Sequence, residues 1–354
     1  MREISRRGLP EALLAGHGGN LFAARSAYPQ APEPWLDLST GISPHAYPFA
    51  GLPGESWTRL PQPEELRTLE AAAAMAYRVP PVAEVIAAPG SQAVIGWLPY
   101  LFLAKRAGIL GFTYHEHARR WERAGARVTI ARELPELASQ DAAVVVNPNN
   151  PDGRLVPAAA LHRLGRALAA RGGLLIIDEA FIDFLEPAAS AIPDMPARGV
   201  VVLRSFGKAY GLPGLRLGFA IGPRDLMAKL RAALGPWPVS CSAIAIGSKA
   251  LMDAAWLAAV RLQLAAQGTA LDRLLTAAGF DLIGGSMLFR LAQHLDAQIW
   301  FERLAEAGIL VRRFEARPQW LRFGIPGTDA DLTRLAHALG LETNNQAASG
   351  LKPF

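Results

Sequence analysis

VLRSFGKAYGLPGLRLGF, residues 202–219, is the stretch that decides the fold class. An apolar run ends in Ser205 and Lys208, and a glycine-rich turn leads from there to Arg216 and a second apolar run. A lysine at the end of a buried strand, with a hydroxyl and an arginine nearby, suits an amine that forms a Schiff base beside a bound phosphate, because desolvation and neighbouring cations make such an amine nucleophilic. A solvated loop lysine would explain the stretch as well. The rest of the chain has to decide between these interpretations.

The composition is that of a folded protein. The chain has 354 residues, of which 51% are hydrophobic and 19% are charged, so it can form a sizeable core as two domains or as one large α/β domain. The formal net charge is +5, but no run of five basic residues occurs. We therefore expect no nucleic-acid partner, and the charge suits small anionic substrates.

Three features of the sequence bear on location. Cys241 is the single cysteine, which excludes an internal disulfide and a cysteine-cluster metal site and favours a reducing compartment. The basic N-terminal segment carries Glu11 in a short apolar part, which argues against a signal peptide. The longest apolar stretch, 93–104, is too short to span a bilayer and contains Pro99. We expect a cytoplasmic protein that does not enter a membrane.

Strand and helix signals alternate along most of the chain. Continuous apolar runs separated by helical segments predict an α/β fold, with a mostly parallel sheet covered by helices on both faces. The predicted strands are 85–88, 109–112, 128–131, 143–146, 174–177, 200–203 and 217–221, and the predicted helices include 64–78, 115–125 and 157–171.

The predicted domains follow from changes in composition along the chain. Residues 31–63 are rich in Pro and Gly and predict an extended segment with turns, and a helical region is interrupted at Pro236-Trp237-Pro238. We predict an N-terminal arm at 1–30, a large domain at 31–238, a smaller α+β domain at 239–342 and a flexible tail at 343–354.

Several polar residues lie where predicted strands end, and ligands bind at that edge in such sheets. Gly90, Ser91 and Gln92 close one strand and open a helix, so their free amides form an anion site or a plain helix cap. Tyr114 ends the next strand and can stack on a flat ligand or pack in the core. Asn150, in a proline-containing turn, can present its amide to a ligand or only shape the turn.

Asp178 follows a very apolar strand, where a carboxylate is costly unless a cation pairs with it. The strand resembles the Walker B pattern of ATPases, but the chain has no G-x-x-x-x-G-K-[ST] motif. A protonated ring nitrogen of a ligand would satisfy this carboxylate. Together with the anion site, the aromatic residue, the amide and Lys208, it meets the requirements of pyridoxal phosphate.

Two further pairs of residues have side chains that can bind ligands. His115 and His117 are spaced i, i+2 and cannot share a helix face, so we predict no metal site. Arg312 and Arg322 lie on predicted strands of the smaller domain and suit a bidentate grip on carboxylate or phosphate, although surface salt bridges would explain each of them singly.

These elements resemble the fold-type I pyridoxal-phosphate enzymes of the aspartate aminotransferase superfamily, over about residues 15–340. The resemblance is carried by PGSQ (89–92), Tyr114, NPNNPDG (147–153), DEAF (178–181), SFGK (205–208), Arg216 and WLRFGIP (320–326). It implies that Lys208 forms the Schiff base and that Asp178 faces the cofactor's ring nitrogen. The rest of the implied cofactor site consists of Gly90, Ser91, Gln92, Tyr114, Asn150, Phe181, Ser205 and Arg216.

Within that superfamily, the chain looks most like the branch of histidinol-phosphate aminotransferases and threonine-phosphate decarboxylases. The motifs HGGN (17–20), LSTGISP (38–44), RLP (59–61) and DEAFIDF (178–184) are more similar to the decarboxylases. The resemblance implies a homodimer that converts L-threonine O-3-phosphate to (R)-1-amino-2-propanol O-phosphate and CO2 in cobalamin synthesis. It implies that Arg322 binds the substrate carboxylate, and we place the substrate phosphate near His17, Asn20 and Arg312.

Two residues depart from the aminotransferase pattern. Phe181 stands where aminotransferases usually carry a tyrosine, and Leu60 stands where a tyrosine of the neighbouring subunit usually reaches the phosphate. Both departures disfavour amino transfer. A histidinol-phosphate-type aminotransferase is the first alternative, and a non-catalytic protein on the same fold is the second.

Overall fold

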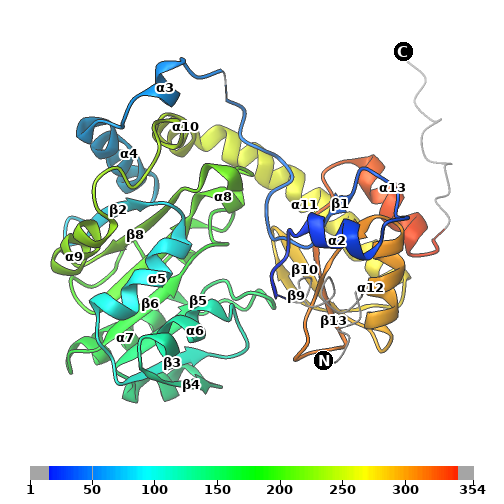
Figure 1. Ribbon diagram of the computed structural model, residues 1–354. Coiled ribbons are helices and arrows are strands. Elements are labelled where there is room, and N and C mark those ends of the chain that lie inside the picture. The colour runs from blue at the N-terminus through cyan, green and yellow to red at the C-terminus, as the bar shows by residue number, and fades with distance from the viewer. Residues whose placement is uncertain (1–15, 50, 342–354) are drawn as a thin grey trace, which may run out of the picture. The chain divides into compact units, whose positions relative to one another are not determined.

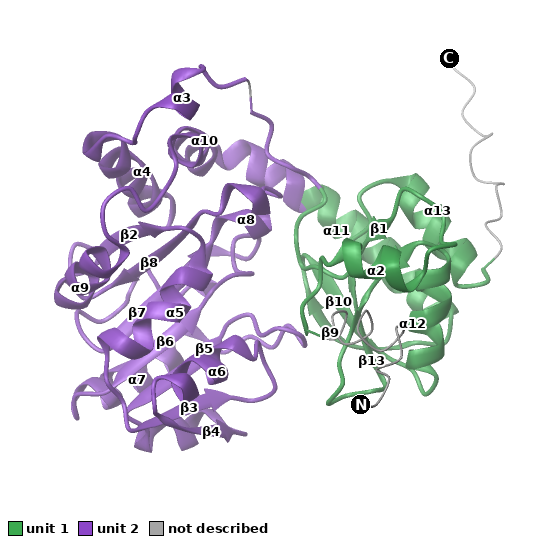
Figure 2. Ribbon diagram, in the orientation of Figure 1, with its two compact units in different colours: residues 1–44, 262–354 green, residues 45–261 purple. Residues whose placement is uncertain are grey.

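The computed structural model describes residues 16–49 and 51–341 (Figure 1). Contacts divide the chain into two compact units. Unit 1 comprises residues 1–44 and 262–354, and unit 2 comprises residues 45–261 (Figure 2).

These units do not share the bounds of the domains predicted at 31–238 and 239–342, and that division stays a prediction. The predicted tail at 343–354 and residues 1–15 of the predicted arm lie outside the described residues.

A mostly parallel sheet forms the centre of unit 2, as the sequence predicts. Its strands in the described part of the unit are β2 (Glu84–Ala88), β3 (Arg106–Leu110), β4 (Arg127–Ala131), β5 (Ala142–Val146), β6 (Leu174–Asp178), β7 (Val200–Ser205) and β8 (Gly218–Gly222). Their order across the sheet is β2-β8-β7-β6-β5-β3-β4. The pairs between β3 and β7 are parallel, whereas β8 runs antiparallel to both of its neighbours.

Helices cover both faces of this sheet. Those of unit 2 are α3 (Glu55–Thr58), α4 (Pro63–Ala76), α5 (Ser91–Leu101), α6 (Glu116–Arg123), α7 (Ala158–Ala169), α8 (Phe206–Ala209), α9 (Arg224–Leu234) and α10 (Cys241–Met252). Val94 of α5, Trp121 of α6 and Met227 of α9 share one buried core with Val201 of β7. Successive strand residues face opposite sides, so Val200 points to the other face. There α7 packs so closely that a Cβ on its Gly165 would lie 2.3 Å from a Val200 methyl carbon.

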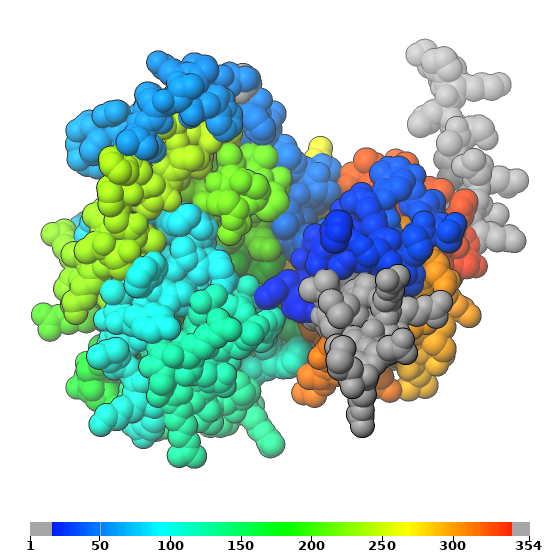
Figure 3. Space-filling view, in the orientation of Figure 1, coloured from blue at the N-terminus to red at the C-terminus, as the bar shows by residue number. Residues whose placement is uncertain are grey.

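Helices α4 and α10 pack against each other in the same unit. A Cβ on Gly247 of α10 would lie 3.0 Å from Cδ1 of Leu69 in α4, so the small residue permits the close approach. In the space-filling view, the blue α4 segment lies beside the yellow-green segment that includes α9 and α10 (Figure 3).

Strand β3 corrects one predicted boundary, since it spans Arg106–Leu110 and not 109–112. Arg106 is exposed and its guanidinium bonds to Asp141 at 3.0 Å, so a charged residue begins the strand. The strand ends before Gly111, whose φ of 67° turns the chain away.

An antiparallel sheet forms the centre of unit 1. In residues 16–44 and 262–341 the strands are β1 (Leu36–Asp37), β9 (Asp281–Ser286), β10 (Phe289–Gln293), β11 (Ile309–Leu310), β12 (Arg312–Arg313) and β13 (Trp320–Gly324). The order β12-β13-β10-β9 makes one sheet, and β1 pairs with β11 in parallel, which joins residues from both ends of the chain. The helices are α2 (Leu21–Ala27), α12 (Ala297–Glu306) and α13 (Asp329–Ala338).

Helix α11 (Ala254–Ala277) carries the chain from unit 2 into unit 1. Among the described residues, no single helix has both the length and the apolar character needed to cross a membrane. Helices α10 and α11 reach that threshold only when taken as a pair, and the pair is bent by 78°.

Candidate active site

The residues predicted to hold the cofactor gather at one edge of the unit 2 sheet. The parallel strands β5, β6 and β7 all end at this edge, and the reversed strand β8 begins there. The register sets Asp178 of β6 opposite Leu203 of β7, and Ser205 of β7 opposite Gly218 of β8. Residues from distant parts of the sequence therefore meet at the edge.

An anion cradle forms where α5 begins. Gly90 precedes the helix with φ 80° and ψ 154°, a conformation open to glycine and little else. A Cβ at this position would lie 2.7 Å from Nη2 of Arg216, so the guanidinium lies directly over the glycine. The free N–H groups of the first helical turn and the arginine together suit a phosphate.

Ser91, the first residue of α5, and Ser205, the last residue of β7, both lie at this cradle. A Cβ on Gly218 would lie 2.3 Å from the amide nitrogen of Ser91, and Gly218 is the strand partner of Ser205. The close packing of β8 on the start of α5 thus brings both serines to the cradle. Ser205 also precedes α8, the short helix that carries Lys208.

Asp178 is buried at the end of β6, with 4% of its surface exposed. Its Oδ2 lies 2.9 Å from Nε2 of His117, and its Oδ1 accepts a hydrogen bond from the amide of Ala180 at 3.1 Å. The carboxylate is therefore held in one orientation at the sheet edge.

His117 is a residue that the sequence reasoning missed as part of this site. It lies in the first turn of α6, is 2% exposed, and contacts Asp178 across 61 residues of sequence. The i, i+2 spacing of His115 and His117 bears on metal binding and gives no sign of the contact with Asp178. The signal that points to it is the buried carboxylate of Asp178, which needs a partner, together with a histidine about one helical turn after Tyr114.

Tyr114 lies between the cradle and Asp178. Its hydroxyl donates to Oε1 of Gln92 at 3.0 Å, and its ring meets that of His117 edge-on at 6.1 Å. Burial, followed by the negative charges of Glu116 and Asp178, raises the pKa of Tyr114 to about 12. The phenol therefore stays neutral and can present a flat face to a ligand.

Lys208 lies in α8, directly after β7. Its Nζ is 5.7 Å from the centroid of the Phe181 ring, and Phe181 itself is buried. The helix is packed tightly against the following turn, because a Cβ on Gly207 would lie 2.8 Å from Cα of Pro213. The Phe181 ring therefore lies near the amine of Lys208, and the tight packing of Gly207 on Pro213 fixes the backbone that carries it.

Asn150 follows β5 in the turn at 147–153. The first residue of this turn, Asn147, donates its amide to the carbonyl of Asp178 at 2.8 Å and fixes both ends of the turn through its side-chain bonds to Val156. Asn150 is half-buried at the same sheet edge as Asp178.

A buried ionic network lies next to Asp178, between β7 and the segment that follows β6, and the sequence analysis did not predict it. Arg204 of β7 donates to Glu179 at 3.1 Å and to Asp183, and its guanidinium lies 4.1 Å from the Tyr77 ring centroid. Glu179 also accepts from the hydroxyl of Ser190 at 2.7 Å. The network joins the residues after Asp178 to the strand that precedes Lys208.

The predicted substrate residues all lie in unit 1. Arg312 and Arg322 are direct partners across the antiparallel pair β12–β13. Burial, followed by the positive charge of Arg312, lowers the pKa of Arg322 to about 9. Two like charges opposite each other on a sheet are unfavourable unless an anion lies with them, so this pair suits an anionic ligand.

His17 and Asn20 belong to the segment at 16–20 in the same unit. Arg312 donates from Nη2 to the carbonyl of Gly16 at 2.9 Å. The side chain of Asn20 caps α2 by accepting from the amide of Ala23 at 3.0 Å. A role of Asn20 or His17 in substrate binding stays a prediction.

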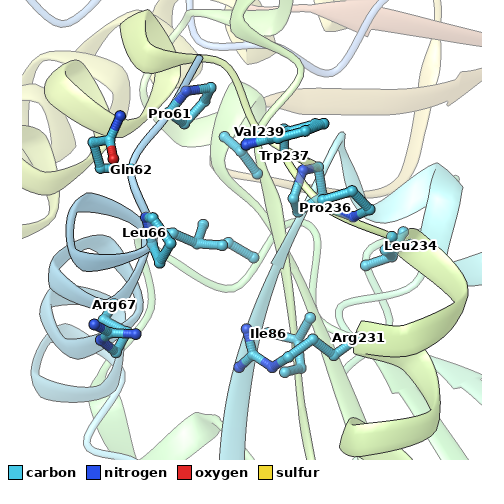
Figure 4. A pocket seen from close by; sticks show the side chains of 14 residues that line it. Pro61, Gln62, Leu66, Arg67, Ile86, Arg231, Leu234, Pro236, Trp237 and Val239 are labelled. Atoms are coloured by element: carbon cyan, nitrogen blue, oxygen red, sulfur yellow. The ribbon is translucent and has the colours of Figure 1, made fainter.

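A separate cavity of about 310 Å³ opens in unit 2 between α4 and the turn after α9 (Figure 4). Leu66, Ile86 and Trp237 contribute apolar side chains to it, and Arg67 and Arg231 lie at its margin. None of the residues predicted to hold the cofactor lines it.

Known proteins resemble the chain over most of its length. A threonine-phosphate decarboxylase of Sinorhizobium sp is 43% identical over 91% of this chain and 97% of its own length. A threonine-phosphate decarboxylase of Pseudomonas aeruginosa is 41% identical over 91% and 96%. The crystal structure of histidinol-phosphate aminotransferase from Sinorhizobium meliloti in complex with pyridoxal-5'-phosphate has a TM-score of 0.74 at 21% identity, covering 90% of this chain and 92% of that one.

The sequence model of one family matches residues 52–339, which include the whole sheet edge described above. Together with the relatives above 40% identity, this match agrees with the resemblance drawn from the sequence motifs and with the α/β architecture of unit 2. The chain belongs to the family of class I and II aminotransferases.

Proposed function

We propose that the chain is a pyridoxal-phosphate enzyme that decarboxylates L-threonine O-3-phosphate to (R)-1-amino-2-propanol O-phosphate and CO2. One observation supports pyridoxal phosphate as the cofactor. Lys208, Asp178 and the cradle of Gly90 and Arg216 all lie at the same edge of the unit 2 sheet. The choice of reaction is supported by the similarity to two threonine-phosphate decarboxylases over 91% of the chain.

The residues at this edge fit pyridoxal phosphate. The guanidinium of Arg216 can lie against residue 90 because that residue lacks a Cβ, which would otherwise meet Nη2 at 2.7 Å. Ser91, Gln92, Ser205 and Arg216 would hold the cofactor phosphate, Asn150 would contact its phenolic oxygen, and Tyr114 would stack on its ring. When bound, the cofactor acts as an electron sink for a bond at the substrate α carbon.

The chain's own groups then perform three tasks. Asp178, oriented by His117, holds a proton at the ring nitrogen of the cofactor. Lys208 would hold the cofactor through its amine, and that amine would be the group that returns a proton to the substrate α carbon. Arg322 binds the substrate carboxylate, and Arg312 binds the substrate phosphate beside His17.

The first alternative is a histidinol-phosphate-type aminotransferase, and one experiment separates the two. Purified protein with pyridoxal phosphate is given L-threonine O-3-phosphate, and both CO2 and glutamate-dependent amino transfer are measured. We expect CO2 and the amino alcohol phosphate in equal amounts. Amino transfer without CO2 would contradict the proposal and favour the aminotransferase.

The second alternative, a non-catalytic protein on this fold, predicts no bound cofactor. We expect borohydride reduction to fix pyridoxal phosphate to the peptide that contains Lys208, and Lys208→Ala to abolish this labelling. Absence of labelling in the wild-type protein would favour the non-catalytic alternative.

The proposal also includes a homodimer, a cytoplasmic location and a place in cobalamin synthesis. The exposed side chains of Trp57 and Leu60, 69% and 55% exposed in the segment at 45–63, support a protein partner for that surface. Light scattering of the purified protein tests the dimer, and a mass of one chain would contradict it.

A further inference from the structure

Gly18 and Gly19, the glycines of the motif at 17–20, have no role in the proposed chemistry so far, and hydrogen bonds hold their segment at Gly16 and at Gly19. The carbonyl of Gly16 accepts a hydrogen bond from Arg312 at 2.9 Å. The amide of Gly19 donates to the hydroxyl of Ser39 at 2.7 Å. His17 and Gly18 lie between these two anchors, within unit 1.

Ser39 contacts both this segment and the substrate arginine. It is 1% exposed, its hydroxyl accepts from Gly19, and its carbonyl accepts from Nη2 of Arg322 at 2.8 Å. One buried residue therefore fixes the position of the segment and that of the guanidinium at the same time.

Asp37 fixes the orientation of the Ser39 hydroxyl. Its Oδ1 lies 2.5 Å from the Ser39 Oγ and 2.9 Å from the Ser39 amide nitrogen. An ionised carboxylate only accepts hydrogen bonds, so the hydroxyl donates its proton to Asp37 and keeps its lone pairs for the amide of Gly19. The two hydrogen bonds therefore run in one direction, from the Gly19 amide to the Ser39 hydroxyl and from that hydroxyl to Asp37.

Gly18 permits the close approach that this arrangement needs. A Cβ on residue 18 would lie 2.3 Å from the carbonyl oxygen of Ser39, the oxygen that also binds Arg322. Any side chain here would push the segment away from Ser39. The motif HGGN is thus explained by contact with Ser39 and not by a need for flexibility.

We propose that Ser39 is a positioning residue that holds the segment of His17 beside the substrate phosphate and holds Arg322 at the substrate carboxylate. The inference rests on the proposed function, in which Arg312 and Arg322 bind the anionic groups of threonine phosphate. Ser39 touches neither substrate nor cofactor, and it acts through Gly19 and Arg322. Its loss therefore weakens substrate binding and leaves the cofactor and the bond-breaking step unaffected.

The test uses the full-length holoenzyme, in which the cofactor occupies its own phosphate cradle. Ser39→Ala removes the hydroxyl that accepts the amide of Gly19, and Gly18→Ala keeps every polar group but adds the clashing Cβ. We expect either variant to raise KM for threonine phosphate about tenfold with kcat within about twofold. The dissociation constant of inorganic phosphate, measured by calorimetry, rises by the same factor.

Ser286→Ala is the matched control, because the Ser286 hydroxyl also accepts a backbone amide in unit 1, that of Leu288 at 3.1 Å. We expect it to leave KM and the phosphate affinity within about twofold of the wild-type values. A drop in kcat without a change in KM for Ser39→Ala would overturn the inference, as would a Gly18→Ala protein with wild-type constants. If Ser39→Ala does not fold, Gly18→Ala alone decides.

The phosphate titration separates this inference from the proposed function. Should the wild-type protein release no CO2 from threonine phosphate, the proposed function fails, and weaker phosphate binding in the two variants still supports the role of Ser39. Equal phosphate affinity in the wild-type protein and both variants overturns that role, as does a wild-type holoenzyme that binds no phosphate.

Discussion

Replacing Gly90 with alanine should weaken cofactor binding at least as much as it weakens the fold. The new Cβ would lie 2.7 Å from Nη2 and 3.3 Å from Cζ of Arg216. A guanidinium is the far end of a flexible side chain, so it moves aside while the backbone stays. Because the guanidinium moves, Arg216 loses its contact with the cofactor phosphate.

The size of the effect of Gly90→Ala is estimated from a cost in folding free energy and a cost in binding free energy. A residue other than glycine at φ 80° and ψ 154° costs about 1–3 kcal/mol of folding free energy. Losing one hydrogen bond to a charged group costs about 1.5–3 kcal/mol of binding free energy. Because each 1.4 kcal/mol is about a factor of ten, the dissociation constant for pyridoxal phosphate should rise by about 10- to 100-fold.

The assay is an absorbance titration of cofactor-free protein with pyridoxal phosphate. Gly96→Ala in the same helix is the control, since no atom lies within 4 Å of a Cβ built there. That change should stabilise α5 by about 0.5–1 kcal/mol and leave the cofactor affinity unchanged. A Gly90→Ala protein with wild-type affinity would refute the assignment of the cradle.

Three other predictions concern the same unit. His117→Phe removes the partner of Asp178 at 2.9 Å and should lower kcat/KM for threonine phosphate about tenfold or more, whereas an unchanged value would show that the pair has no catalytic role. Arg204→Met leaves Glu179 and Asp183 buried without their cation and should lower the free energy of unfolding by about 3–5 kcal/mol in urea titrations; a loss under about 1 kcal/mol would contradict the network. Removing the cofactor by dialysis should lower Tm, because a ligand at about 100 times its Kd stabilises the folded state by about 2.7 kcal/mol, and an equal Tm with and without it would be evidence against binding.

Most of the fold could be predicted because the strands of unit 2 are continuous apolar runs. The segment 174–178 is buried on both faces, and such a strand has a composition that is hard to confuse with a loop. The reversed direction of β8 was not predicted, since its apolar residues are the same whichever way it pairs. The pairing of β1 with β11 was missed because each strand has only two residues.

Some residues of the candidate site could likewise be predicted from the sequence, and others could not. Residues at strand ends, such as Ser91 and Asp178, could be found because the topology rule for parallel sheets locates ligands there. The bond between His117 and Asp178 joins residues 61 positions apart, and no local pattern encodes such a pair. Arg204 was hidden for a different reason, since it lies within an apolar strand and its two partners lie in another segment.

The reversal of β8 has a consequence for the order in which the protein folds. Because β7 and β8 are antiparallel neighbours, residues 206–217 leave the sheet and return to it at one edge, so Lys208 lies in a hairpin-like connection and not on a crossover. Closing a short loop costs less chain entropy than joining distant segments. The surroundings of the lysine can therefore form early and locally, whereas Asp178 and Ser91 reach the same edge only when the long-range pairings are complete. The ability to bind the cofactor should therefore arise only in the last steps of folding. The time at which cofactor binding begins during refolding can be compared with the time at which Lys208 becomes buried.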